Sequence, residues 1–299
     1  MHKKYNLLNR AYLYRLSLSL AHVLPLFLMR WMSKNIATIC YFLYKDSKRN
    51  VENNLSHVFN DSAKVKTIGK EIFINYGIYV ADWAKLITED SEKVLSRFSA
   101  IQGREAFKSA YEKGKGIILL AAHLGNWELG GFFFGRSGIP INIITAKDEV
   151  EAIANIRESA RYSHNVRTIT IDDEPFFFID IVNALKRNEI VAMLIDRYER
   201  KNGVLIDFFG EPAYFPPGPV LLARSTGCAV LPAFTIMEKN GNYKTAVGAA
   251  IDMEFTDDKN RDISVNLRKI VKVFEQYIRE YPDQWYNFSP IWNKNKPLA

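Results

Sequence analysis

The sequence predicts an α/β fold: a mainly parallel sheet with a mixed edge, flanked by helices, behind an N-terminal hydrophobic helical anchor. Five short apolar runs are typical of buried strands. Segments with helical periodicity separate most of them, which favours crossover units, parallel pairing and helices on both faces of the sheet. Two further apolar runs near the N-terminus have basic flanks and predict the anchor.

The strands and helices alternate along most of the chain. Residues 239–241 form a turn pattern between 234–237 and 243–253, which predicts an antiparallel hairpin at the sheet's edge. Residues 48–90 repeat apolar side chains at helical spacing. The remaining predicted strands are 116–122, 141–145, 166–171, 190–195 and 229–236, and the remaining predicted helices are 126–136, 149–163, 175–187, 219–226 and 261–281. We divide the chain into an anchor over 1–47 and an α/β domain over 48–299.

The N-terminal runs are short for membrane spans. Residues 16–29 contain no Lys, Arg, Asp or Glu, whereas a spanning helix needs about 20 apolar residues. A second apolar run covers 36–44, and basic and aromatic residues flank both. This pattern favours helices that lie in the membrane interface or barely cross it. A cleaved signal peptide and an apolar core helix of a soluble protein are the alternatives.

The charge balance narrows the class of partner. With 40 Lys and Arg against 33 Asp and Glu, the net charge is +7. The chain has no run of five basic residues and no nucleic-acid module with a readable signature, so we expect a membrane surface or a phosphorylated substrate and no nucleic acid. The two cysteines, Cys40 and Cys228, lie far apart in apolar segments, which fits a reducing compartment.

His123 is the best candidate for chemistry. It follows an apolar strand, at the sheet edge where α/β proteins bind ligands. Gly125 permits a tight turn, Asn126 is a good helix N-cap, and Glu128 falls in the first helical turn. We expect Glu128 to bind one imidazole nitrogen, so that the other accepts a proton, and amides near Gly125 and Asn126 to hold an oxyanion. The alternative for any single histidine is a packed or surface residue.

Four further residues are candidates for substrate binding. Asp196 and Arg197 follow the strand 190–195, so we expect them at the same sheet edge, where Arg197 can bind a phosphate. Arg161 can do likewise, and Gly218 precedes a helix whose start can hold an anion. An exposed ion pair and a solvated helix face are the alternatives for the arginines. We expect no metal, because the second histidine of H-E-x-x-H is missing.

The block HLGNWE, residues 123–128, resembles the H-x-x-x-x-D/E signature of the lysophospholipid acyltransferase superfamily. From about residue 10 to the C-terminus, the chain more closely resembles the bacterial lipid A biosynthesis (lauroyl/myristoyl) acyltransferases. The blocks that carry this resemblance are RNVENNL (49–55), DR (196–197), GVLIDFFGEP (203–212), PGP (217–219) and DQWY (283–286).

The resemblance implies a function for the domain over 48–299. It implies transfer of a fatty acyl chain from an acyl carrier protein or coenzyme A thioester, without a covalent acyl-enzyme and without a further cofactor. It also implies His123 as the base, Glu128 as its partner, and an acceptor at the cytoplasmic face of the inner membrane: a lipid A precursor or a related bacterial lipid.

One departure bears on the acceptor. Residues 287–292 read NFSPIW and lack the histidine and basic residues that the family usually carries there. This favours a lysophospholipid, glycolipid or aminolipid over a heavily phosphorylated lipid A precursor. A thioesterase or esterase, in which water replaces the lipid acceptor, and a non-catalytic lipid-binding protein of the membrane are the alternative functions.

Overall fold

A computed structural model describes residues 18–136, 138–146, 151–171, 176–197 and 203–292. A seven-stranded sheet in the order β1-β9-β8-β2-β5-β3-β4 forms its centre, and a separate two-stranded hairpin pairs β6 with β7. All neighbours in the large sheet are parallel except β8 and β9, so the predicted mainly parallel sheet is confirmed. The strands are β1 (Phe98–Gln102), β2 (Ile117–Ala121), β3 (Ile141–Ala146), β4 (Val166–Ile171), β5 (Ile190–Leu194), β6 (Val204–Phe208), β7 (Glu211–Phe215), β8 (Ala229–Met237) and β9 (Tyr243–Val247).

The edge of the sheet differs from the prediction. β8 and β9 form the expected antiparallel hairpin, but β1 pairs in parallel outside β9, so the hairpin is not the edge. β9 also ends at Val247, although the pattern extended to residue 253. β1 gives little signal in the sequence because its five residues include Ser99 and Gln102 and three of the five are exposed.

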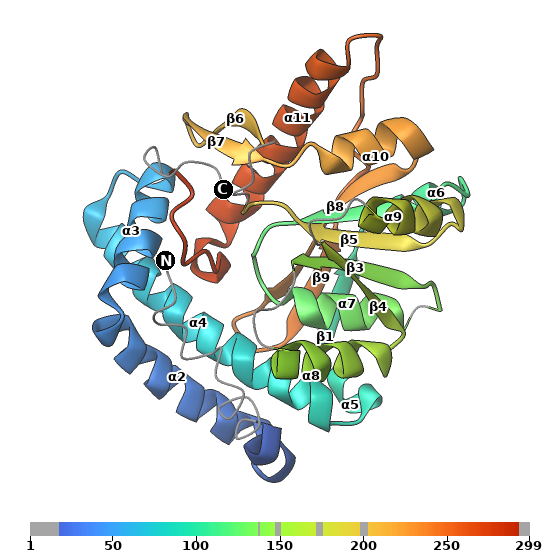
Figure 1. Ribbon diagram of the computed structural model, residues 1–299. Helices are drawn as coiled ribbons and strands as arrows, with labels where there is room; N and C mark the ends of the chain where they lie inside the picture. The colour runs from blue at the N-terminus through green and yellow to red at the C-terminus, as the bar shows by residue number, and fades with distance from the viewer. Residues whose placement is uncertain (1–17, 137, 147–150, 172–175, 198–202, 293–299) are drawn as a thin grey trace.

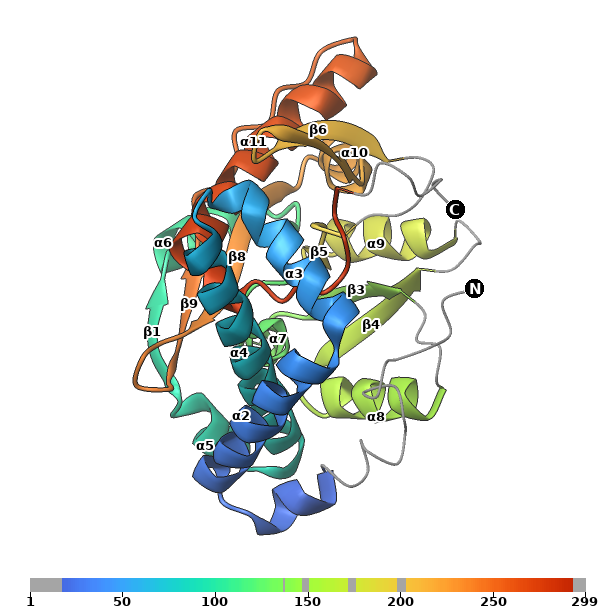
Figure 2. The ribbon, with the colours of Figure 1, turned by 90° about the vertical axis from the view of Figure 1, so that its left-hand side faces the viewer.

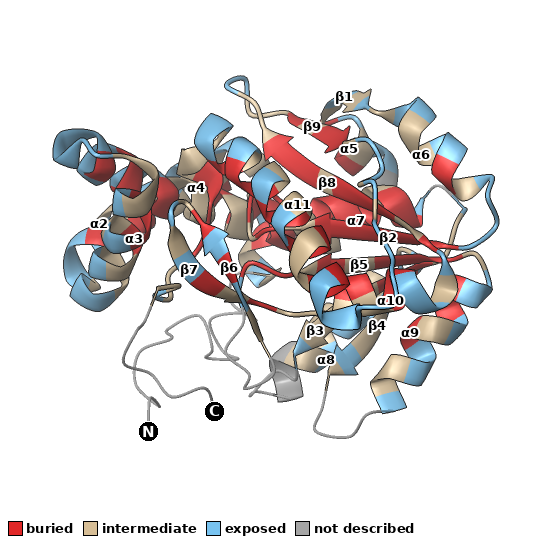
Figure 3. Ribbon diagram, turned by 90° about the horizontal axis from the view of Figure 1, so that it is seen from above, coloured by how far each residue is buried: buried red, intermediate tan, exposed pale blue. Residues whose placement is uncertain are grey.

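Helices cover both faces of the sheet (Figures 1 and 3). Alternate residues of β2 point to opposite faces. Ile118 and Leu120 join the core formed with α9, α10 and α11, whereas Ile117 and Leu119 join the core formed with α6 and α7. The helices that follow β1 in the chain are α6 (Arg104–Tyr111), α7 (Trp127–Gly135), α8 (Glu151–Tyr162), α9 (Phe176–Lys186), α10 (Gly218–Thr226) and α11 (Lys259–Glu280).

The N-terminal helices form a further layer beside the sheet, and this layer faces the viewer in Figure 2. α2 (Leu26–Leu43) packs along α4 (Ser62–Thr88), with α3 (Lys45–Val58) against both and α5 (Ser91–Leu95) following α4. At Gly77, α4 approaches α2 so closely that a Cβ would lie 2.7 Å from the Ser33 carbonyl oxygen of α2. Arg30 of α2 also donates two hydrogen bonds of 2.8 Å to the buried Asp82 of α4. α2 is therefore attached firmly to the body of the protein.

Among residues 18–292, within the described ranges, we find no helix with both the length and the apolar character needed to cross a membrane. Residues 1–17 of the predicted anchor lie outside the described residues. The division of the chain at residue 47 remains a prediction.

Candidate active site

Parallel pairing of β2 and β5 brings two site residues together. Ala121 lies opposite Leu194 in this register, so the chain two residues further on places His123 beside Asp196. Oδ1 of Asp196 lies 2.6 Å from Nδ1 of His123 and accepts the His123 backbone N–H at 3.0 Å. Because a carboxylate only accepts hydrogen bonds, Nδ1 must carry the hydrogen. Asp196 was predicted as a substrate-binding residue, but it is buried and faces the imidazole.

The surroundings keep His123 neutral. Burial lowers the pKa of His123 below its ordinary value, and this outweighs the opposing effect of the Asp196 carboxylate. The charge of Arg197 lowers the His123 pKa further. For Asp196, burial alone would raise the pKa, but His123, Arg197 and a hydrogen bond from the Trp285 indole bring it below the ordinary value. A neutral imidazole therefore lies beside an ionised carboxylate.

Glu128 has a different partner from the predicted one. Its two carboxylate oxygens accept hydrogen bonds from Arg161 of α8, at 2.6 Å from Nη2 and 3.2 Å from Nε. The expected hydrogen bond from Glu128 to one imidazole nitrogen is therefore wrong: Asp196 binds Nδ1, and Glu128 faces Arg161. Burial alone would raise the pKa of Glu128, but Arg161, aided by the charge of Arg157, lowers it below its ordinary value. The result is a nearly buried ion pair between α7 and α8.

Arg161 was predicted to bind a phosphate. Its third nitrogen, Nη1, donates to the Thr168 hydroxyl at 3.3 Å, so each of the three guanidinium nitrogens has a protein partner. The structure thus makes Arg161 the partner of Glu128.

The segment between β2 and α7 is held on both sides. The amide of Gly125 donates to the Gln284 carbonyl at 3.0 Å, and that of Asn126 donates to the Thr235 carbonyl at 2.7 Å. These two amides are therefore engaged, so the predicted binding of an oxyanion near Gly125 and Asn126 would need neighbouring amides at the helix start. Gly125 has φ +69°, and a Cβ there would lie 2.1 Å from the Thr235 carbonyl oxygen, so only glycine fits. Asn126 is the predicted N-cap: its side-chain oxygen accepts the Leu129 amide at 3.1 Å.

Trp127, the first residue of α7, lies beside the imidazole. The rings of Trp127 and His123 are edge to face, with centroids 5.3 Å apart. Tyr79 of α4 also packs on the Trp127 indole, with ring centroids 4.7 Å apart. The His123 side chain keeps 16% of its surface exposed. No residue of the described ranges forms a hydrogen bond with its Nε2, so that nitrogen remains able to accept a proton.

The C-terminal segment completes the surroundings of the histidine. The Trp285 indole N–H donates to Oδ2 of Asp196 at 2.9 Å, and the Tyr286 amide donates to the His123 carbonyl at 2.7 Å. Sequence reasoning assigned no role to either residue. The only available signal was the block 283–286 that contains them.

Arg197 has surroundings that differ from the predicted ones, whereas Gly218 lies at the predicted helix start. Arg197 donates to the Asn287 side-chain oxygen at 3.0 Å and to the Tyr286 carbonyl, so it binds the C-terminal segment. Gly218 begins α10, and a Cβ there would meet no atom within 4 Å. Within the ranges that the structure describes, no hydrogen bond joins Gly218 to the His123 group. Its role in substrate binding remains a prediction.

The described side chains include no group of three or more His, Cys, Asp or Glu residues arranged to hold a metal ion. What the site does contain is a neutral imidazole whose Nδ1 is bound to a carboxylate. Such an arrangement can remove a proton from a hydroxyl or an amine as that group attacks a carbonyl carbon.

Comparison with known proteins identifies the class of reaction. The chain is similar to a phosphatidylinositol mannoside acyltransferase of Mycobacterium tuberculosis, with 26% identity over 223 residues, 73% of this chain and 68% of the relative. It is also 27% identical over 188 residues to the protein of that name from Mycolicibacterium smegmatis, covering 62% of this chain and 59% of the relative. Residues 1–294 match the family described as bacterial lipid A biosynthesis acyltransferase. The protein is therefore an enzyme that transfers acyl groups, and the chain belongs to the bacterial lipid A biosynthesis acyltransferase family.

Proposed function

We propose that the enzyme transfers a fatty acyl chain from a thioester, carried by acyl carrier protein or coenzyme A, to a lipid acceptor, with His123 as general base and Asp196 as the residue that orients it. The observation that carries the proposal is the 2.6 Å contact between Nδ1 of His123 and the buried Asp196 carboxylate at the carboxyl edge of the sheet. That contact fixes the tautomer in which Nε2 is the basic nitrogen.

The proposed reaction balances without a covalent enzyme intermediate. Nε2 of His123 removes the proton of an acceptor hydroxyl while the hydroxyl oxygen forms a bond to the thioester carbonyl carbon. Asp196 stabilises the imidazolium that forms. When the tetrahedral intermediate collapses, the carbon–sulfur bond breaks and the imidazolium returns its proton to the departing thiolate. The products are an acylated lipid and a free thiol, and His123 is neutral again.

Glu128 supports this chemistry indirectly in our proposal. Its ion pair with Arg161 joins the first turn of α7 to α8, and the neighbouring Trp127 lies against the imidazole. The first two amides of α7, those of Trp127 and Glu128, have no acceptor among the described residues. We assign them to the oxyanion in place of the amides of Gly125 and Asn126, because the start of a helix favours negative charge.

We propose a glycolipid as the acceptor, with a sugar hydroxyl as the group that is acylated. The names of the mycobacterial relatives refer to a mannosylated phosphatidylinositol. The uncharged stretch NFSPIW at 287–292 also favours an acceptor with fewer phosphates than a lipid A precursor.

We further propose that α2 docks the enzyme on the cytoplasmic face of the inner membrane. One side of this helix packs on α4, and the other carries large apolar side chains that are more than half exposed. These are Phe27, Trp31, Ile36, Ile39, Phe42 and Leu43. The exposed Lys34 and Lys45 lie in or next to the helix and would attract anionic lipids. Such a face suits an interfacial helix that does not cross the bilayer.

A direct assay tests the proposed reaction. Membranes that contain the wild-type protein or His123→Ala are incubated with a labelled acyl thioester and a total lipid extract. We expect labelled lipid with the wild type and at least a hundredfold less with His123→Ala. Labelled free fatty acid as the sole product would support a thioesterase instead. Lipid binding without turnover in either protein would support a non-catalytic lipid-binding protein.

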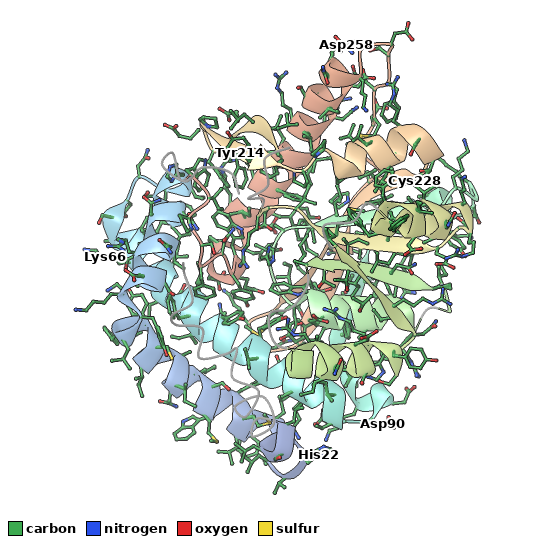
Figure 4. All side chains as sticks on the ribbon, in the orientation of Figure 1. His22, Lys66, Asp90, Tyr214, Cys228 and Asp258 are labelled. Atoms are coloured by element: carbon green, nitrogen blue, oxygen red, sulfur yellow. The ribbon has the colours of Figure 1, made fainter. Side chains whose placement is uncertain are left out.

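The docking proposal is tested with vesicles that contain anionic lipid. The double variant Phe27→Ser and Trp31→Ser should sediment with them much less than the wild type. The matched control replaces Leu205 and Phe255, which are also exposed, with serine. Phe255 lies three residues before Asp258, which Figure 4 shows at the end of the molecule opposite His22. Equal loss of binding in both double variants would contradict the assignment to α2.

A further inference from the structure

The C-terminal segment Gln284–Asn287 begins at the last residue of the 3₁₀ turn Pro282–Gln284 and lies against the loop that follows His123. Leu124 and Trp285 form an antiparallel bridge. The amide of Gly125 donates to the Gln284 carbonyl, and the amide of Tyr286 donates to the His123 carbonyl. Residues 284–286 therefore act as a short extra strand that holds the backbone on both sides of Leu124, directly after His123.

Trp285 also reaches the Asp196 carboxylate with its side chain. Oδ1 of Asp196 serves His123, and Oδ2 accepts the indole N–H of Trp285 at 2.9 Å, although the two residues are 89 positions apart in the chain. Trp285 is 1% exposed and Asp196 is 2% exposed, so water does not compete for this contact. Without the indole, Oδ2 would lose its described donor, and the carboxylate would be free to rotate about its Cβ–Cγ bond.

We propose that Trp285 is a positioning residue for acyl transfer, whose indole N–H holds the Asp196 carboxylate in the plane that binds Nδ1 of His123. This inference rests on the proposed catalytic role of His123 and Asp196. Trp285 itself does not touch the reacting atoms. It acts through Asp196, and the main chain of the same segment fixes the position of His123.

Two asparagine side chains of α3 secure the segment that carries Trp285. Asn54 donates to the carbonyls of Asn287, at 3.0 Å, and Ser289, at 2.8 Å. Asn50 donates to the Phe288 carbonyl at 3.0 Å. On the other side, the Gln284 side chain binds both the amide and the carbonyl of Met237 at the end of β8, at 2.9 Å and 2.8 Å. The asparagine-rich block near residue 50 and the block 283–286 thus serve one structure.

The test is the variant Trp285→Phe, which keeps an aromatic ring and removes the N–H. We expect kcat to fall about 10- to 150-fold, the range for losing one hydrogen bond to a charged group, with KM for the thioester within about twofold of wild type. Without the indole, the Asp196 carboxylate is held less firmly in the plane of the ring and stabilises the imidazolium less, so the pKa of His123 falls. The acid limb of the pH–rate profile should therefore move to lower pH. A purely structural defect would lower activity without moving this limb.

Tyr281→Phe is the matched control. It also removes one polar hydrogen from an aromatic ring, just before the segment, but the Tyr281 hydroxyl accepts from Lys244 at 2.7 Å, donates to Glu280 and does not touch Asp196. We expect wild-type kcat and an unchanged acid limb. A Trp285→Phe enzyme with wild-type kcat and acid limb, beside an inactive His123→Ala, would overturn the inference while leaving the proposed function intact. Full activity in His123→Ala would instead overturn the proposed function.

A measurement on the unmodified protein covers the case in which Trp285→Phe does not fold. In ¹⁵N-labelled enzyme, the indole resonance of Trp285 is assigned through phenylalanine variants of the other four tryptophans. We expect it to shift with the same pH midpoint as the His123 ring, because both bind Asp196, whereas the Trp292 resonance stays constant. An indole resonance of Trp285 that does not respond to the His123 titration would overturn the inference.

Discussion

The substitution Asp196→Asn tests the catalytic pair with almost no change in shape. Asp196 accepts three hydrogen bonds, from the backbone and ring of His123 and from the Trp285 indole. An asparagine has one accepting oxygen and one donating NH2 group. If the oxygen faces His123, the NH2 group points at the indole N–H; if the side chain is flipped, the NH2 group points at the His123 amide and favours the tautomer in which Nε2 carries the hydrogen. In either orientation, the NH2 group of the asparagine faces an N–H group that also donates, so one hydrogen bond is lost.

We expect this variant to lose about 10²–10⁴ in kcat, which corresponds to about 2.7–5.4 kcal/mol of transition-state stabilisation. The pH dependence has a defined sign. The Asp196 charge raises the pKa of His123 against the effect of burial, so its removal lowers that pKa further. The acid limb of the residual activity should therefore move to lower pH, in the same direction as for Trp285→Phe and further.

The assay measures initial rates of acyl transfer from a labelled thioester between pH 5 and 8, together with thermal melting. Asp180→Asn, at an exposed position of α9, is the matched control and should behave as the wild type. If Asp196→Asn melts at the wild-type temperature and keeps more than a tenth of the wild-type kcat, Asp196 is not the residue that orients His123, and the reasoning fails.

Three other predictions follow from the same contacts. In the wild type, burial lowers the pKa of His123, so activity should fall on acidification with a midpoint below about 6.5; a midpoint above 7 would contradict a neutral, buried base. Glu128→Ala should cost about 3–5 kcal/mol of unfolding free energy because it leaves Arg161 charged and nearly buried. The double variant Glu128→Ala and Arg161→Met should cost less than the sum of the two single variants. Glu128→Gln should leave the acid limb of the pH–rate profile in place, because Glu128 does not bind the imidazole. Gly77→Ala should cost about 1–3 kcal/mol in a denaturant melt because its Cβ would press on α2, while Gly218→Ala, whose Cβ meets open space, should melt as the wild type does.

Much of the sheet could be predicted because its strands are buried on both faces. The run IILLA of β2 is apolar at every position, so it gives a clear signal without alternation. β1 and the β6–β7 hairpin escaped because polar residues interrupt them. The position of His123 could be predicted because it directly follows this clear apolar run.

The partner of His123 could not be predicted in the same way. Glu128 is five residues away in the chain and was the obvious local choice. However, the loop between them is held by hydrogen bonds to the carbonyls of Gln284 and Thr235, and Glu128 binds Arg161 of α8. Asp196 was expected at the same edge, yet only the order and register of β2 and β5 show that it faces the imidazole. The same long-range contacts engage the amides of Gly125 and Asn126. Contacts between distant parts of the chain depend on strand order, which local patterns do not encode.

The protonation state of His123 tests the central claim most directly. Nitrogen NMR of ¹⁵N-histidine-labelled enzyme, with the His123 signal assigned by its loss in His123→Ala, distinguishes a ring nitrogen that carries hydrogen from one that does not. At pH 7 we expect a neutral ring with hydrogen on Nδ1 and none on Nε2, and a titration midpoint below about 6.5. Hydrogen on Nε2 of a neutral ring, or a charged imidazolium at pH 7, would contradict the account.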